Sequence, residues 1–191
     1  TRTRRQRQMC IRDRYNILAA TACITSFVNI KKLKKGIFLN INIPKGRGNI
    51  FDVNFENKKI YFVDESYNSN PLSLKSSIEN FEKLVLKKSK KYMFLGDMLE
   101  LGKHSIKQHK LISKIINKTK INKVYVIGKH IKETYKGLDP NKKAKILGNK
   151  LDMLKIIKDD FKTGDYLMVK GSNSTGSVSY THLRAHETWS Y

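Results

Sequence analysis

Short apolar runs alternate with amphipathic segments along residues 60–170. Runs of this length are typical of strands, because buried helices need longer ones. The runs are Ile60–Val63, Tyr92–Leu95, Val124–Ile127 and Tyr166–Val169, with a weaker one near Ala144–Leu147. Between them, apolar residues recur at helical spacing in three groups: Leu74, Ile78, Phe81 and Val85; Leu111, Ile112, Ile115 and Ile116; Leu154, Ile157 and Phe161. This alternation predicts an α/β, Rossmann-like fold with a mostly parallel sheet and helices on both faces.

A helical pattern of another kind stands near the start of the chain. Residues 15–28 are predicted to form a helix that ends in a lysine cluster. Its apolar face consists of Ile17, Ala20, Ile24 and Phe27. Cys23 lies next to that face and is expected to be a small buried residue.

The segment between this helix and the alternating region predicts a linker and a hairpin. Residues 37–48 contain one proline and two glycines within a short stretch and are interpreted as a linker between domains. Asn49–Phe55 and Ile60–Val63 are strand-like and flank the polar turn Glu56–Lys59. This spacing predicts an antiparallel hairpin.

The formal charge of +23 favours a nucleic-acid-binding protein. Its distribution favours a solvated, lysine-rich surface instead, because most arginines lie in residues 1–14 and the middle of the chain is rich in lysine. Residues 1–14 and 178–191 resemble translated sequencing-adapter DNA, so we expect both ends to be foreign to the fold. The alternative for these ends is a natural basic tail that binds RNA or membrane.

The two cysteines and the hydropathy further limit the classes of protein to which the chain could belong. Cys10 and Cys23 have no metal-ligand spacing and indicate neither a disulfide framework nor a zinc site. No apolar run approaches the ~20 residues of a membrane helix. We therefore expect a soluble, cytoplasmic protein.

Acidic or glycine-containing segments follow four of the predicted strands. They are Asp64-Glu65-Ser66, Gly96-Asp97-Met98, Gly128-Lys129 and Lys170-Gly171-Ser172. In parallel α/β sheets, ligands bind beyond the carboxyl ends of the strands. The functional site is therefore expected at this edge of the sheet.

Arg47 is the only arginine between residues 15 and 177, although lysine is abundant there. A guanidinium binds phosphate or carboxylate through a planar fork that lysine lacks. The neighbouring Gly46 and Gly48 would let a ligand approach the backbone. We interpret Arg47 as functional; the alternative is a chance survivor in a surface turn.

The segment Asp64–Pro71 is a polar loop between a predicted strand and a predicted helix. The helix that starts near Pro71 offers free N–H groups to an anion. Asparagine amides suit a peptide or a nucleotide base. The alternative interpretation is that Asn70 or Ser73 only caps the helix.

Three further candidates carry weaker signals. Gly96–Lys103 superficially resembles a phosphate-binding P-loop, but five residues separate its glycines and His104 follows the lysine. The sequence therefore lacks a complete ATP site. His109 shares a helical face with Ile112 and is expected to be a satisfied, semi-buried residue. Lys170 is interpreted either as a contact for phosphate or carboxylate or as one more surface lysine.

Five motifs in order resemble those of Mur ligases of the MurF type, whose patterns are HNxxNxLAA, PGR, DDSYNANP, GDMxELG followed by His, and VKGSR. The matching segments are Asn16–Ala20 (NILAA), Pro44–Arg47 (PKGR), Asp64–Pro71 (DESYNSNP), Gly96–Gly102 (GDMLELG) with His109, and Val169–Ser172 (VKGS). This chain departs from the patterns at Arg12 and Asp13, at Glu65 in place of Asp, and at Asn173 in place of Arg.

The resemblance implies that the chain is the C-terminal portion of an ATP-dependent amide ligase of peptidoglycan precursor synthesis. Residues 15–43 would end the central ATPase domain, and residues 44–177 would form the C-terminal ligase domain without its last helix. ATP with Mg²⁺ would phosphorylate the carboxylate of UDP-N-acetylmuramoyl-tripeptide, and the amine of D-alanyl-D-alanine would attack the acyl phosphate. The enzyme would act as a monomer, without nucleic acid or membrane insertion.

The resemblance also implies roles for individual residues. The catalytic residues would be Arg47, Asp64, Glu65 and Lys170. Asn16 would lie near the adenine, and Arg47 would meet the nucleotide when the domains close. The residues that bind the dipeptide would be Tyr67, Asn68, Asn70, Lys170 and Ser172. No metal ligand is expected in this chain, and by itself it is expected to be inactive.

Two other functions remain open from the sequence. One is a basic α/β protein that binds nucleic acid, which rests on net charge alone. The other is an independent Rossmann-type cofactor enzyme, which lacks a GxGxxG motif after its first strand. The third residue of the tripeptide substrate is not determined by the sequence.

Overall fold

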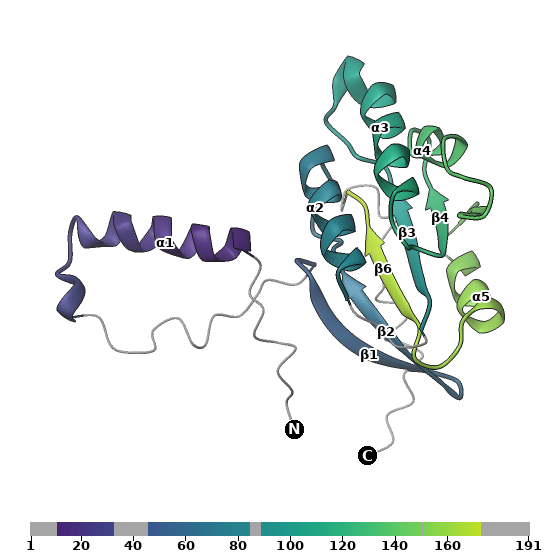
Figure 1. Ribbon diagram of the computed structural model, residues 1–191, viewed down its shortest axis with the longest axis horizontal. Helices are drawn as coiled ribbons and strands as arrows, with labels where there is room; N and C mark the ends of the chain where they lie inside the picture. Colours follow the sequence, from purple (N-terminus) through teal and green to yellow (C-terminus); the bar gives the residue numbers. More distant parts are fainter. Residues whose placement is uncertain (1–10, 33–45, 85–88, 150, 173–191) are drawn as a thin grey trace. The chain divides into compact units, whose positions relative to one another are not determined.

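The computed structural model describes residues 11–32, 46–84, 89–149 and 151–172. The chain forms two compact units, Thr1–Asn42 and Ile43–Tyr191 (Figure 1). The described elements of the first unit are helix α1 (Ile11–Thr25) and the short 3-10 helix η2 (Ile30–Lys32). None of the helices in the described ranges is both long enough and apolar enough to cross a membrane.

Helix α1 differs from its prediction in position and in burial. It runs from Ile11 to Thr25 rather than over residues 15–28, so it begins inside the segment expected to be foreign to the fold. Cys23 is exposed instead of buried, and Phe27 lies beyond the helix with 90% of its surface exposed. Residues 15–29 of this unit are all exposed or half-buried, so the apolar residues of α1 enter no core among them.

A six-stranded sheet forms the centre of the second unit. Its strands are β1 (Asn49–Phe55), β2 (Lys58–Asp64), β3 (Lys91–Gly96), β4 (Lys123–Ile127), β5 (Lys143–Ile146) and β6 (Tyr166–Lys170). Their spatial order is β1-β2-β6-β3-β4-β5. β1 pairs with β2 in antiparallel fashion, and the other pairs are parallel. The predicted mostly parallel sheet is therefore confirmed.

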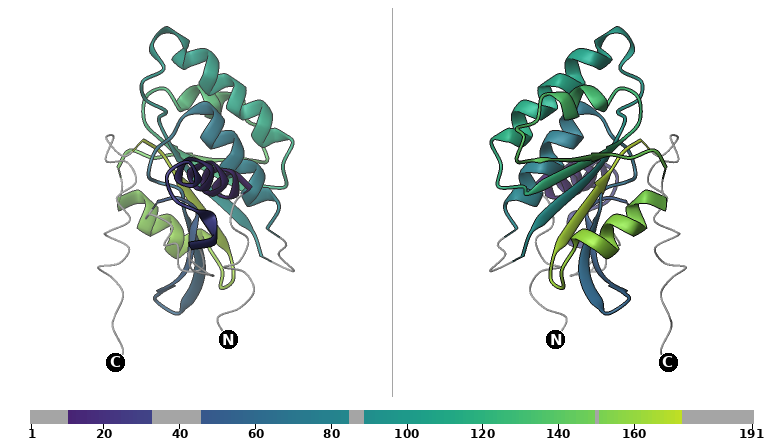
Figure 2. Two further views of the ribbon diagram at one scale, coloured as in Figure 1. Left: turned by 90° about the vertical axis from the view of Figure 1, so that its left-hand side faces the viewer. Right: turned by 90° about the vertical axis from the view of Figure 1, so that its right-hand side faces the viewer.

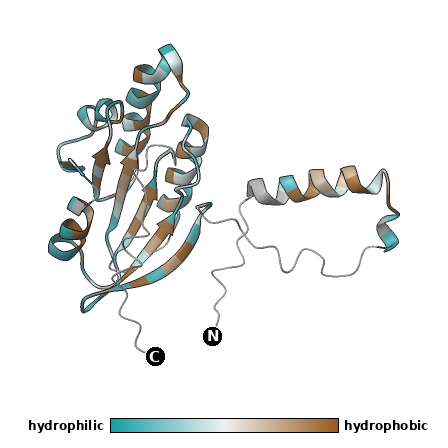
Figure 3. Cartoon of the chain, turned by 180° about the vertical axis from the view of Figure 1, so that it is seen from behind, coloured by the Kyte–Doolittle hydropathy of each residue, from teal (hydrophilic) through white to brown (hydrophobic). Residues whose placement is uncertain are grey.

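Helices cover both faces of this sheet (Figure 2). The helices α2 (Pro71–Glu82), α3 (Ser105–Asn117) and α4 (Lys132–Lys136) pack on one face, and α5 (Leu151–Asp160) packs on the other. In β3, Met93 and Leu95 belong to the first core, whereas Tyr92 and Phe94 belong to the second. Because both faces are covered, the central strands are mostly apolar, and brown predominates in the middle of the sheet in Figure 3.

The predicted helical faces are largely confirmed. The side chains that are essentially inaccessible include Leu74, Ile78, Phe81, Ile112, Ile116, Ile157 and Phe161. Leu111 is an exception with 41% exposure, because Ile112 and Ile116 already occupy the buried stripe of α3. Helix α4 was not predicted, since its five residues are too few for a periodic pattern. Val85 lies outside the described residues.

The β1–β2 hairpin has a shorter turn than predicted. Phe55 pairs with Lys58, so Glu56 and Asn57 alone form the turn that was expected over Glu56–Lys59. Glu56 has a φ of 50°, in the left-handed region that tight hairpin turns use. β2 therefore begins at Lys58, two residues earlier than the apolar run suggested.

A candidate ligand site at the carboxyl edge of the sheet

Four parallel strands end at one edge of the sheet. The register pairs Asp64 with Val169, Leu95 with Lys170, and Gly96 with Ile127. Because β6 lies between β2 and β3, its end is flanked by the loops that follow both of those strands. The prediction that these strand ends meet at a common edge is confirmed.

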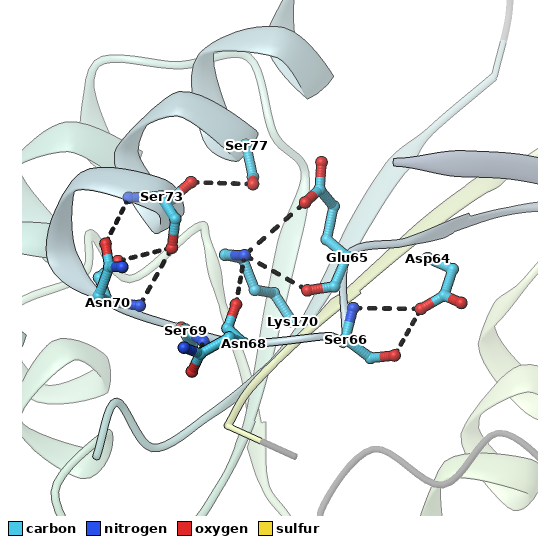
Figure 4. Close-up of polar contacts among 9 residues, drawn as sticks. All are labelled: Asp64, Glu65, Ser66, Asn68, Ser69, Asn70, Ser73, Ser77 and Lys170. Carbon is cyan, nitrogen blue, oxygen red and sulfur yellow. Dashed lines mark hydrogen bonds and ion pairs between the residues drawn. The ribbon is translucent and has the colours of Figure 1, made fainter. Parts of the chain in front are cut away.

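The Lys170 side chain is buried beneath the loop that follows β2 (Figure 4). Only 2% of this side chain is exposed. Its ammonium donates hydrogen bonds to the carbonyls of Asn68 (2.8 Å) and Glu65 (3.3 Å) and lies 3.7 Å from the Glu65 carboxylate. A buried ammonium without acceptors would be strongly unfavourable, so these contacts hold the loop against β6. Lys170 thus lies under the surface of the site and not on it.

Asp64 and Glu65 occupy different environments although they are adjacent. Asp64 is buried, and its carboxylate accepts hydrogen bonds from the Ser66 backbone N–H (3.1 Å) and hydroxyl (2.6 Å). Burial raises the pKa of the Glu65 carboxyl; the Lys170 ammonium and the Ser77 hydroxyl oppose that rise, and the Asp64 charge adds to it. The Glu65 side chain is 20% exposed and is the more accessible carboxylate of the two.

A Gly-Arg-Gly clip, residues Gly46–Gly48, presents Arg47 beside this loop. The Tyr67 N–H donates to the Gly46 carbonyl (3.0 Å), and the Gly48 N–H donates to the Asp64 carbonyl (2.7 Å). A Cβ on Gly46, whose φ is +81°, would lie 2.6 Å from the Tyr67 nitrogen, so the clip requires glycine there. The exposed Arg47 side chain places its guanidinium carbon 4.2 Å from the centre of the Tyr67 ring.

Asn68 and Asn70 are exposed, but their side-chain oxygens are used locally. Asn68 Oδ1 accepts a hydrogen bond from the Ser69 N–H (2.7 Å). Asn70 Oδ1 accepts from the Ser73 N–H (2.8 Å), and the Ser73 hydroxyl accepts from the Asn70 N–H (3.0 Å). This capping box shows that Asn70 and Ser73 cap the start of α2; the substrate role of Asn70 stays a prediction. Within the described residues, the hydrogen bonds of these two side chains are made by their oxygens.

Ser172 joins three loops and is only 3% exposed. Its hydroxyl accepts a hydrogen bond from the Leu99 N–H (3.1 Å) and donates one to the Ser69 carbonyl (3.4 Å). Its backbone N–H donates to the Asp97 carbonyl (3.1 Å). Ser172, which was predicted to bind substrate, is thus placed between the loops after β2 and β3. The neighbouring Asn173 lies outside the described residues.

Asp97 fixes the loop that follows β4, a role that sequence reasoning missed. Its carboxylate accepts hydrogen bonds from the backbone N–H groups of Lys129 (2.9 Å) and Ile131 (2.7 Å). A Cβ on Gly128 would lie 2.6 Å from this carboxylate, so the close approach depends on glycine. An acid after one strand and a glycine after the adjacent strand were the available signal in the sequence.

His109 supports the loop after β3 from below. It is fully buried, beyond the semi-buried state that was predicted, and its Nε2 accepts a hydrogen bond from the Met98 N–H (3.1 Å). Nδ1 lies 2.8 Å from the Ser105 carbonyl, which can only accept, so Nδ1 carries the proton of a neutral ring. Burial lowers the pKa of His109, and the Ser105 carbonyl and the Asp97 charge oppose that change.

The remaining predicted residue, Asn16, belongs to the first unit and is exposed on α1. Its contact with a nucleotide stays a prediction. In the described parts of the chain, no group of three or more His, Cys, Asp or Glu side chains could hold a metal ion. The edge therefore offers an exposed guanidinium, one accessible carboxylate and asparagine amides, a set that suits anions and peptides.

Comparison with known families and proteins shows what this chain is similar to. The family described as Mur ligase, glutamate ligase domain, matches residues 46–173. The UDP-N-acetylmuramoyl-tripeptide–D-alanyl-D-alanine ligase of Rickettsia prowazekii is 31% identical over 134 residues, which are 70% of this chain and 28% of that protein. The protein of the same name from Buchnera aphidicola is 32% identical over 84% of this chain and 34% of its own length. The chain thus spans about a third of these curated relatives.

Solved structures show the same fold at lower sequence identity. The MurF ligase from Thermotoga maritima in complex with ADP has a TM-score of 0.66 at 20% identity, over 88% of this chain and 36% of that one. A crystal structure of MurF from Acinetobacter baumannii has a TM-score of 0.65 at 20% identity, over 90% of this chain and 37% of that one. At this identity, the likeness concerns the fold alone.

Removing the Ser69 hydroxyl should stabilise the protein. This hydroxyl is buried and has no hydrogen-bond partner among the described residues, and alanine stands at this position in the DDSYNANP pattern. Ser69→Ala should raise the free energy of unfolding by about 1 kcal/mol, because an unsatisfied buried group is lost. Ser172→Ala is the matched control and should lower it by about 1–2 kcal/mol, since the Leu99 N–H loses its acceptor. Urea denaturation measures both changes, and a loss of stability in Ser69→Ala would contradict the assignment.

Acid should weaken the fold through His109. Its folded pKa lies below the ordinary value of about 6.5, so the unfolded state binds more protons between these two values. The free energy of unfolding should therefore fall as the pH drops through about 6.5, and the loss should continue down to the lowered folded pKa. Urea denaturation from pH 7.5 to pH 5.5 tests this. In His109→Gln the slope should be shallower; an unchanged slope would assign the acid sensitivity to other groups.

Proposed function

This chain belongs to the Mur ligase family, and from that premise we propose that it carries the C-terminal ligase domain of an enzyme that joins D-alanyl-D-alanine to UDP-N-acetylmuramoyl-tripeptide. The product would be a peptidoglycan precursor. Four relatives that bear this name, each 31–33% identical, support the proposal. The observation that carries it is the clipping of the exposed Arg47 to the loop Asp64–Pro71 at the carboxyl edge of the sheet.

The nucleotide side of this proposal rests on Arg47 and Glu65. The Arg47 guanidinium is exposed, and a planar fork of N–H donors suits phosphate oxygens. Glu65 offers the accessible carboxylate of the same loop, while Asp64 stabilises the loop from within. In the full-length enzyme, ATP with Mg²⁺ would activate the tripeptide carboxylate, and Asn16 would lie near the adenine.

The dipeptide side rests on the loop after β2. The side-chain NH₂ groups of Asn68 and Asn70 suit the carbonyl and carboxylate oxygens of D-alanyl-D-alanine. Lys170 and Ser172 would contribute indirectly, because both are buried and hold this loop in place. Their effect on substrate binding would therefore arise through the position of the asparagines.

The proposed reaction forms one amide bond. The amine nitrogen of D-alanyl-D-alanine attacks the carbonyl carbon of the acyl phosphate, the carbon–oxygen bond to phosphate breaks, and phosphate and a proton leave. Water would hydrolyse the same acyl phosphate, so closure of the domains of a monomeric enzyme has to bring the amine close and exclude water. An edge whose loops are already held by buried contacts suits that task.

Phosphate release tests the activity. The full-length protein should release phosphate from ATP only when both UDP-N-acetylmuramoyl-tripeptide and D-alanyl-D-alanine are present. The present chain alone should release none above a buffer control. Release by the full-length protein without D-alanyl-D-alanine, or with another amine in its place, would contradict the proposed substrate.

Arg47→Lys should reduce turnover of the full-length enzyme without a comparable loss of stability. Lysine keeps the charge but cannot form two parallel hydrogen bonds. The loss of one charge-assisted bond costs roughly 1.5–3 kcal/mol, or about ten- to a hundredfold in kcat. Steady-state kinetics and a thermal melt of the same variant measure both effects.

The matched control is Lys155→Arg, a change of the opposite kind on the exposed side of α5. It should leave turnover as it is. Normal turnover in Arg47→Lys would make the lone arginine dispensable, whereas lost stability with normal turnover per folded molecule would make it a structural clamp.

A further inference from the structure

The side chains of Arg47 and Tyr67 form a pair at the surface of the site. The guanidinium carbon lies 4.2 Å from the centre of the Tyr67 ring, well within the range of a cation–π contact. The Tyr67 side chain is 53% exposed, so packing in the core does not explain where its ring lies. Among the described residues, the cation over this ring is Arg47, the residue proposed to meet the nucleotide.

The backbone holds the two residues in register. The Tyr67 N–H bonds to the Gly46 carbonyl, and the Gly48 N–H bonds to the Asp64 carbonyl, one hydrogen bond on each side of Arg47. The short approach of Gly46 to the Tyr67 backbone fixes the distance between the two chain segments. The clip therefore brings the Arg47 side chain to the Tyr67 ring whatever the rest of the site binds.

The Tyr67 ring restrains the Arg47 guanidinium without occupying its N–H groups. Within the described residues, the ion pairs of Asp and Glu are with lysines, and no carboxylate pairs with Arg47. A carboxylate would occupy two of the N–H groups, whereas an aromatic ring attracts the cation through its π-face. An arginine free in solvent would have to order a long side chain each time it binds an anion.

We propose that Tyr67 is a positioning residue, whose ring pre-orients the Arg47 guanidinium for the anionic group that it binds in the reaction. This inference rests on the proposed function and deepens it. Tyr67 was expected from the sequence to contact the dipeptide; here it acts on the reaction through Arg47. Arg47 is the side chain that the ring would orient, and it is also the residue at which a lysine ammonium should not replace the guanidinium.

Kinetics of the full-length enzyme distinguish a Tyr67 that orients Arg47 from a Tyr67 that contacts D-alanyl-D-alanine directly. Tyr67→Leu should lower kcat/KM for ATP by about two- to fivefold, the range of an exposed cation–π contact, and Tyr67→Phe should recover most of that loss. The KM for D-alanyl-D-alanine should not change. In an Arg47→Lys background, Tyr67→Leu should add little further loss, because the group that the ring positions is already gone.

Tyr135→Leu is the matched control. Tyr135 also has a lysine near its ring, with the Lys143 ammonium 5.9 Å from the centre, but it lies on α4 next to β5. Its replacement should leave kcat/KM per folded molecule as it is. A raised KM for D-alanyl-D-alanine in Tyr67→Leu that persists in the Arg47→Lys background would overturn the proposal and make Tyr67 a direct substrate contact.

A spectroscopic test does not depend on catalysis. In the present chain, the guanidinium Nε–H resonance of Arg47, assigned by its loss in Arg47→Lys, should be displaced upfield by the ring current of Tyr67. Tyr67→Leu should remove the displacement, and Tyr67→Phe should keep it. An Nε–H resonance that Tyr67→Leu leaves unmoved would overturn the proposal. A displaced resonance in a protein whose full-length form lacks ligase activity would refute the proposed function and still support the pairing.

Discussion

The buried ammonium of Lys170 is the constraint on which the site depends. β6 ends between two neighbouring strands, and a lysine at that point cannot reach water, because only 2% of its side chain is exposed. An unpaired cation there would be far too unfavourable, so oxygen atoms have to come to it. The carbonyls of Glu65 and Asn68 and the Glu65 carboxylate meet that need, and in doing so they determine the path of the loop after β2.

The position of this loop over Lys170 determines where the other residues of the site lie. The outer side of the loop carries the exposed residues Tyr67 and Asn68, and its backbone provides the partners that clip Gly46 and Gly48 in place. The residues of the site thus divide into a buried set that holds the loops and an exposed set that can meet ligands. This division explains how exposed side chains on loops can be held in place, since buried hydrogen bonds and an ion pair fix the loop beneath them.

Because β6 also lies next to β3, buried side chains hold the loop after β3 as well. Ser172 bonds to the loops on both sides of it, through Ser69 and Leu99. His109 supports the adjacent Met98 from α3, and Asp97 ties this loop to the one after β4. Three loops that are distant in the sequence are therefore connected by hydrogen bonds made mostly by buried side chains. A ligand that contacts one loop meets a surface whose other parts are held by the same network.

The sequence by itself determined most of the strands and helices of the second unit, their alternation, and the edge of the sheet at which the candidate site was expected. These follow from local periodicity and from the short polar segments after each strand, which do not depend on distant residues. It also indicated Arg47, because an arginine in a lysine-rich stretch is visible in composition alone. The segment Asp64–Pro71 could be located because it is a polar stretch between a predicted strand and a predicted helix.

Only the tertiary structure decided which of these residues are exposed and which are buried. Lys170 and Ser172 are buried and bond to the neighbouring loops, because β6 inserts between β2 and β3, a neighbour relation that no local pattern encodes. Cys23 looked buried and is exposed, since burial depends on a covering element and not on the helix itself. The stacking of Arg47 on Tyr67 joins two segments that only the backbone hydrogen bonds of the clip bring together. Periodicity specifies which face of an element is apolar, but the partner of each polar side chain is set by the order of the strands in space.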